Sequence, residues 1–182
     1  MTLKHLLVAA AVAGMASLAL SAGASAATTV TVQATTPFGG WLDTGLNLSA
    51  GATYDLAVNN PATLWSAGSD IPFPRSSTAD GIPANAGYGQ QTMAGYTFNF
   101  GALVGDVGGT LFLIGASPVS VTGLSGELTV GYWDSYYGDN SGAQSLTISA
   151  VPEPASWAMM LIGVGAVGGA LRSRRKPAPV AA

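Results

Sequence analysis

The sequence predicts an all-β fold: an antiparallel β-sandwich of about eight strands, flanked by an N-terminal signal peptide and a C-terminal transmembrane helix. Charged residues make up only 8% of the 182 residues and 25 are glycines, which favours a turn-rich β domain over a helical one. Short runs in the middle of the chain alternate apolar and polar residues, the period of half-buried strands. Clusters of Gly, Pro, Asn and Asp separate these runs, as turns do.

Five alternating runs justify the strands in chain order, and no part of the middle has a sustained helical period. The segment 59–95 is rich in Pro, Gly and Ser and breaks the alternation. Because strand-like runs flank it on both sides, we predict a large functional loop rather than a linker. The apolar positions of the five runs are Val30, Val32 and Ala34; Tyr54, Leu56 and Val58; Tyr96, Phe98 and Phe100; Leu124, Leu128, Val130 and Tyr132; and Leu146 and Ile148.

Residues 1–26 have the pattern of a cleaved signal peptide. Lys4 and His5 precede an apolar run that ends near Leu20, and Ala24-Ser25-Ala26 fits the cleavage pattern of small residues. The alternative is an uncleaved membrane anchor. Cleavage leaves residues 27–150 as one small domain, a length that can bury a core of its own.

Residues 151–182 form a second terminal segment. Pro152-Glu153-Pro154 is followed by an apolar stretch over 155–171, which as a helix would be about 26 Å long and could cross a thin bilayer. The basic cluster 172–176 follows and predicts a cytoplasmic end. The domain would then face outward, with the membrane stop made of Arg172, Arg174, Arg175 and Lys176.

This segment resembles the PEP-CTERM sorting signal. The residues that match its motif over 152–158 are Pro152, Glu153, Pro154, Trp157 and Ala158. The resemblance implies an exosortase as processing partner, export through the inner membrane with transient anchoring there, and a final place at the cell surface or in the extracellular matrix. It also implies bacteria that make extracellular polysaccharide. The alternative is a plain C-terminal anchor.

Composition excludes several functions for the domain 27–150. The chain has no cysteine, its one histidine is His5, and its two lysines lie outside the domain, which excludes Ser-His-Asp, Cys-His and Schiff-base chemistry. Only Arg75 opposes eight acidic residues there, a net charge of −7, which argues against nucleic-acid binding. The pair Asp134 and Asp139 could in principle serve a glycosidase, but no second motif supports one, so we predict that the chain is not an enzyme.

The loop 134–142 is the best candidate binding site. Asp134, Asp139 and Asn140 offer oxygen ligands of the kind calcium prefers, and Gly138 and Gly142 let the backbone curl around an ion. The alternative is an ordinary hairpin turn, because Asp and Asn favour turns in any case.

The middle domain resembles the PA-I-type calcium-dependent galactophilic lectins, which are β-sandwiches. The resemblance implies Asp134, Asp139 and Asn140 as side-chain calcium ligands, completed by a carbonyl in this loop and another after Val58. The segments that carry it are 41–51, 100–104, 124–134 and 138–142.

The chain also departs from these lectins. Its loop is two residues shorter, and the family's sugar-contacting His-Pro-x-Gln stretch falls on Ser77-Thr78-Ala79-Asp80, with neither His nor Gln. A sugar site is still expected, with Asp80 beside Asp134 and Asp139. The residues that could form an aromatic platform for a sugar, or else pack in the core, are Trp65, Trp133, Tyr136 and Tyr137.

Two functions from different classes follow. The first is a calcium-dependent carbohydrate-binding module, exported to the surface or matrix, with extracellular polysaccharide as a partner. The second is a structural or matrix protein, associated with biofilm or exopolysaccharide, that keeps the sandwich for stability and binds no small ligand.

Overall fold

A computed structural model describes residues 26–36, 38–68, 75–86, 89–152 and 154–173. The predicted signal peptide, apart from Ala26, lies outside these residues. The chain divides into two units, and Ser25–Glu153 is one of them. All of the described strands and both buried clusters lie within this unit, so it carries the interactions that it needs to fold by itself.

The first sheet is antiparallel and has four strands. Its order is β1 (Thr28–Gln33), β12 (Ala143–Val151), β3 (Thr53–Val58) and β10 (Val119–Thr122). The alternation in the sequence decides which face is buried, because successive side chains of a strand point to opposite faces. Leu56 is paired with Ile148 across β3 and β12, and both are buried.

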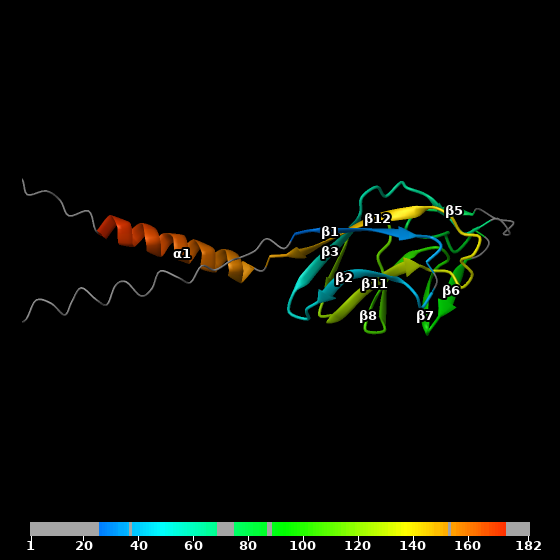
Figure 1. Cartoon of the computed structure of the whole chain (residues 1–182), viewed down its shortest axis with the longest axis horizontal. Helices are drawn as coiled ribbons and strands as arrows, with labels where there is room; N and C mark the ends of the chain where they lie inside the picture. Colours follow the sequence, from blue (N-terminus) through cyan, green and yellow to red (C-terminus); the bar gives the residue numbers. More distant parts are fainter. Residues whose placement is uncertain (1–25, 37, 69–74, 87–88, 153, 174–182) are drawn as a thin grey trace, which may run out of the picture. The chain divides into compact units, whose positions relative to one another are not determined.

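The second sheet also has four antiparallel strands. Its order is β2 (Leu42–Leu48), β11 (Gly126–Tyr132), β8 (Leu103–Val107) and β9 (Thr110–Leu113). Leu128 and Val130 of β11 point into the same buried cluster as Leu56 and Ile148 of the first sheet. The two sheets therefore form the layers of a sandwich around one core (Figure 1), which confirms the predicted all-β antiparallel architecture.

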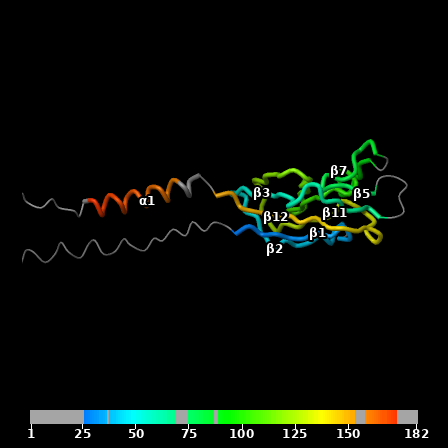
Figure 2. The backbone as a smooth tube through the Cα atoms, turned by 90° about the horizontal axis from the view of Figure 1, so that it is seen from above, coloured from blue at the N-terminus to red at the C-terminus, as the bar shows by residue number. Residues whose placement is uncertain are grey.

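The segment 59–95 is not the strand-free loop that its composition suggests. It contains β4 (Trp65–Ser66), paired with β5 (Ser76–Ser77), and β6 (Gln90–Met93), paired with β7 (Tyr96–Asn99). Strands of two to four residues are too short to show a period in the sequence. The β6–β7 hairpin and β5 lie at one end of the domain (Figure 2), and this end carries the candidate site.

The helix α1 (Pro154–Ser173) begins at a proline, which suits the first position of a helix because its missing N–H has no partner there. No helix in the described residues is both long and apolar enough to cross a membrane. The predicted apolar stretch 155–171 lies within α1. Gly and Ala fill eight of the twenty positions. Of the basic cluster, only Arg172 is described.

Candidate functional site

The connection from β11 to β12 places Asp134 in a buried position at the end of the second sheet. Only 3% of the Asp134 residue surface is exposed, and the preceding Trp133 is fully buried. The backbone N–H of Tyr136 donates to Oδ1 of Asp134 at 2.8 Å. This turn, two residues wide, is the local hydrogen bond that Asp side chains commonly form, and it fixes one carboxylate oxygen.

Asn140 holds the other end of the loop. Its Nδ2 donates to Oδ2 of Asp134 at 2.9 Å and to the carbonyl of Ala34 at 3.1 Å, and the residue is 6% exposed. Its Oδ1 is buried and accepts no hydrogen bond from any described residue. A buried amide oxygen without a donor is costly, so it calls for a ligand that supplies positive charge or a donor.

The stretch after β3 reaches the same loop. Ser66 and Ser141 exchange two backbone hydrogen bonds of 2.8 and 3.1 Å. Two residues along from Ser66, Gly68 has φ +96°, and a Cβ at this position would overlap the carboxylate of Asp139. Only a glycine fits both constraints. The backbone of the stretch after Val58 therefore lies against the acidic loop, where the lectin resemblance expects a contributing carbonyl.

Negative charge is concentrated at this point. Burial raises the pKa of Asp134, and the nearby Asp139 raises it further, while hydrogen bonds from Tyr136 and Asn140 act in the opposite direction. Burial also raises the pKa of the Tyr132 hydroxyl, to which Asp134 and Asp139 add. Both shifts have the same main cause, because burial disfavours the charged form of each group, and a neighbouring negative charge adds to it in both cases. A bound cation would favour the charged forms of both groups and so act against the rise in their pKa values.

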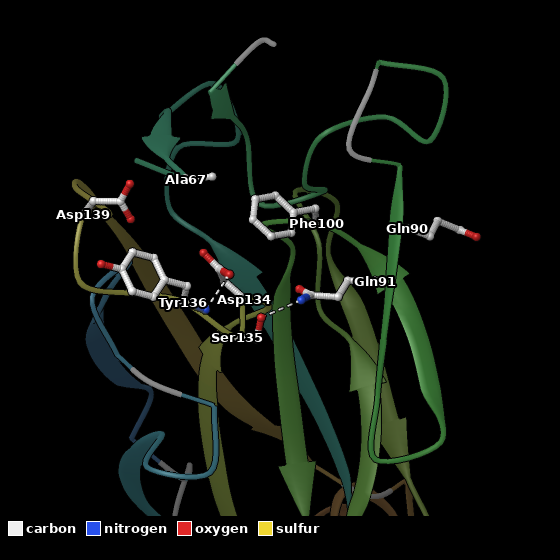
Figure 3. Close-up of a pocket in the computed structure, with 8 residues that line it drawn as sticks. All are labelled: Ala67, Gln90, Gln91, Phe100, Asp134, Ser135, Tyr136 and Asp139. Atoms are coloured by element: carbon white, nitrogen blue, oxygen red, sulfur yellow. Dashed lines mark hydrogen bonds between the residues drawn. The ribbon is translucent and has the colours of Figure 1, made fainter. Parts of the chain in front are cut away.

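Asp134 and Asp139 both line a pocket of about 290 Å³ (Figure 3). The opposite wall belongs to β6, where Nε2 of Gln91 donates to Oγ of Ser135 at 2.9 Å. Oε1 of Gln91 is buried and accepts nothing from the described residues. In Figure 3 the Gln91 side chain points toward Asp134, while Gln90 points away. The remaining lining residues are Ala67, Phe100 and Tyr136.

The structure brings together three of the four polar residues that the sequence singles out, and places Asp80 elsewhere. The Asp80 carboxylate accepts the N–H of Ala116 at 2.8 Å, and its carbonyl accepts Nδ2 of Asn99 at 3.0 Å. Asp80 is also bridged to Ala102 and does not line the pocket. Its groups secure neighbouring segments of backbone.

Two of the four aromatic residues expected as a platform are core residues. Trp65 and Trp133 are 1% and 0% exposed, and their Nε1 groups donate to the carbonyls of Thr78 and Gln91. Tyr136 and Tyr137 are 68% and 44% exposed, so only these two can meet a ligand. Sequence reasoning missed Gln91, because no pattern in 59–95 indicates that β6 lies opposite Asp134.

The donor set consists of oxygens. Among the described residues, no three His, Cys, Asp or Glu side chains are grouped so that they could hold a metal ion. The loop offers two carboxylates and an amide oxygen instead, and such hard oxygen ligands suit calcium better than a transition metal.

The comparison with protein families identifies the C-terminal segment. A model of the PEP-CTERM protein-sorting motif matches residues 150–176, which confirms the sorting segment that the sequence predicts. The motif implies an exported protein that an exosortase sorts. No curated protein matches the chain.

One similar solved structure is the EclA N-terminal domain, a PllA-like lectin. It is 22% identical to this chain, with a TM-score of 0.49, and the match covers 68% of this chain and 95% of that one.

Proposed function

We propose that this exported protein uses the loop 134–140 to bind one calcium ion and, through it, a carbohydrate. The exosortase would release the domain, predicted as residues 27–150, to the cell surface or matrix, after transient retention by the C-terminal segment. The observation that carries the proposal is the buried Oδ1 of Asn140, which has no donor among the described residues, beside the buried carboxylate of Asp134.

These residues fit a calcium ion. Asp134, Asp139 and Asn140 would hold it with side-chain oxygens, and backbone carbonyls of the loop and of the stretch after Val58 can add to them, as calcium sites commonly require. A cation would satisfy Asn140 Oδ1 and would offset the burial and the Asp139 charge that raise the pKa of Asp134. When bound, calcium supplies open coordination positions that accept the hydroxyl oxygens of a sugar.

The pocket suits a ligand with hydroxyl groups. Its lining presents acceptors, namely the carboxylates of Asp134 and Asp139 and the amide oxygen of Gln91. A sugar hydroxyl can donate to an acceptor while its oxygen coordinates the ion. Ser135 keeps the Gln91 amide in place through the 2.9 Å hydrogen bond, so this acceptor is positioned before a ligand binds.

Two measurements on the unit Ser25–Glu153 test the proposal. Calorimetric titration should show one calcium bound, and magnesium should substitute poorly because it demands small octahedral geometry and keeps its waters. A glycan array should then show binding in calcium that a chelator abolishes. Absence of heat with calcium would remove the proposal.

The second candidate is a structural protein of the matrix without a ligand. The hydrogen bonds from Asn140 and Tyr136 to Asp134 favour it, since they hold the loop without an ion. It predicts no calcium heat and no glycan signal, and it would stand if both measurements were negative.

A further inference from the structure

We infer that Tyr136 is the specificity-determining residue of this pocket, because it provides an apolar platform for the ring of an uncharged sugar. The inference deepens the proposed function and rests on it. It assigns to Tyr136 a role separate from holding the ion, and it names the class of sugar.

The position of Tyr136 is fixed while its side chain stays open. Its backbone N–H donates to Oδ1 of Asp134 at 2.8 Å, so its backbone is fixed next to a carboxylate that lines the pocket. Its side chain nevertheless lines the pocket and the residue is 68% exposed. In Figure 3 the ring lies beside the Asp134 and Asp139 carboxylates. An exposed aromatic ring next to polar groups adds an accessible apolar face to a site that Ala67 and the buried Phe100 also line.

Gly138 keeps one end of the ring clear. A Cβ at this position would lie 3.7 Å from the Tyr136 hydroxyl and 3.8 Å from its Cζ, in direct contact. A larger side chain there would begin to cover the ring. The absence of a side chain at Gly138 therefore leaves the hydroxyl end of the Tyr136 ring uncovered on that side.

The charges of the pocket restrict the ligand. Among the described residues that line it, the only carboxylate side chains are those of Asp134 and Asp139, and no side chain is basic. Calcium would balance these two charges and leave nothing to pair with a carboxylate, sulfate or phosphate of a ligand. A neutral sugar fits, since its hydroxyls meet the oxygen ligands and the ion, and the C–H face of its ring meets Tyr136.

Tyr137 provides a matched control. It is the next residue on the same loop and is 44% exposed, but it does not line the pocket. Replacing either tyrosine by Ala removes the same atoms from the same loop. An effect of loop packing alone should therefore appear in both variants, whereas stacking on a ligand should appear in Tyr136→Ala only.

The experiment is calorimetric titration of the unit Ser25–Glu153 in saturating calcium. The probes are the methyl glycosides of galactose, glucose and mannose, together with methyl glucuronide. Tyr136→Ala should weaken the best neutral glycoside about tenfold, as expected from the loss of roughly 55 Å² of apolar contact. Tyr136→Phe and Tyr137→Ala should bind as the parent does. Calcium affinity should be the same in all four proteins, and the glucuronide should bind more weakly than the neutral glycosides.

Three results would overturn the inference while calcium binding stands: no neutral glycoside binds the parent, Tyr136→Ala binds like the parent, or Tyr137→Ala loses as much as Tyr136→Ala. Preferred binding of the glucuronide would contradict the assignment to uncharged sugars. If the parent binds no calcium, the proposed function itself is wrong, and the two failures are therefore distinguishable.

Discussion

Asn140 donates from Nδ2 to Oδ2 of Asp134 at 2.9 Å, so that two residues six positions apart close the acidic loop with one buried hydrogen bond. The same Nδ2 reaches Ala34, the residue that follows β1. The pair thus links the loop to the edge of the first sheet. It also turns the Asn140 amide so that its oxygen, and not its nitrogen, is left without a partner among the described residues.

Asn140→Ala should lower the free energy of unfolding by about 1–3 kcal/mol, because it removes both donors and leaves the Asp134 carboxylate and the Ala34 carbonyl less well satisfied. Urea denaturation in chelator measures the change. Asn47→Ala is the control, since Asn47 is exposed on β2. Equal stability of the two variants would show that the Asn140 hydrogen bonds carry no net weight.

Gly68→Ala should destabilise the domain and weaken calcium binding, because its methyl group would displace the carboxylate of Asp139. Gly95→Ala separates this overlap from backbone strain. Gly95 has φ +83°, similar to the +96° of Gly68, and a Cβ there would meet nothing within 4 Å. Both variants should lose about 1 kcal/mol for the left-handed backbone, and only Gly68→Ala should lose calcium affinity in a calorimetric titration. If Gly68→Ala bound calcium as tightly as the parent, Gly68 would have no influence on the ion site.

The buried Asp134 gives the ion-free domain a distinctive pH dependence. Burial raises its folded-state pKa, so the folded state takes up this proton more readily than the unfolded chain does. This contribution to stability is present at low pH and is lost as the pH rises through the folded-state pKa. Unfolding in chelator should therefore become harder as the pH falls from about 7 to about 4.

Asp134→Asn should reduce that gain, whereas Glu127→Gln should keep it. Glu127 lies exposed on β11, so this variant removes one negative charge without touching the buried carboxyl. Chemical denaturation at a series of pH values measures both. If the Asp134→Asn and parent curves run parallel, the buried carboxyl does not titrate differently in the folded state.

The sequence predicts the sandwich because its core residues obey a simple period. Leu56 and Val58 of β3 alternate with Asp55 and the small Ala57, Leu146 and Ile148 of β12 alternate with polar residues, and all four point inward. The same logic does not decide the orientation of Trp133, which follows the last residue of β11 and is fully buried. Beyond the end of a strand, the alternation no longer predicts which face of the sheet a side chain points to.

The candidate site is predicted only in part, because its loop is local and its opposite wall is not. Asp134, Asp139 and Asn140 lie within seven positions, so their proximity follows from the sequence. Gln91 is distant in sequence and is brought near by tertiary contacts, including the 2.8 Å hydrogen bond from Trp133 Nε1 to its carbonyl. The expected position of Asp80 beside Asp134 differs from the structure for a related reason. The segment 59–95 has no regular alternation that would fix how its residues align with those of another family.

Calcium should raise the melting temperature of the unit Ser25–Glu153. At a hundredfold excess over the dissociation constant, binding to the folded state stabilises it by about 2.7 kcal/mol, which corresponds to several degrees for a domain of this size. Asp139→Ala should abolish the rise, and Glu127→Ala, which also removes one acidic charge, should retain it. A rise of equal size in both variants would point to general screening of the acidic surface.

The connector between β12 and α1 should decide sorting. β12 ends at Val151, Pro152 follows it outside any regular element, and α1 begins at Pro154. Proline at 152 cannot donate a backbone hydrogen bond and resists extension of the helix toward the strand. Pro152 is therefore kept out of both regular elements, and it is exposed.

Replacing Pro152, Glu153 and Pro154 together by Ala should leave an uncut precursor in a host that makes an exosortase, because it removes the motif and permits a longer helix. Immunoblots of the membrane and medium fractions would follow the two forms. Pro177→Ala with Pro179→Ala, beyond the matched residues 150–176, should be processed like the parent. Neutral residues at Arg172, Arg174, Arg175 and Lys176 should weaken retention in the membrane fraction, since positive charges there resist translocation. Normal cutting of the triple Ala variant would contradict a role for the motif in sorting, whatever the domain binds.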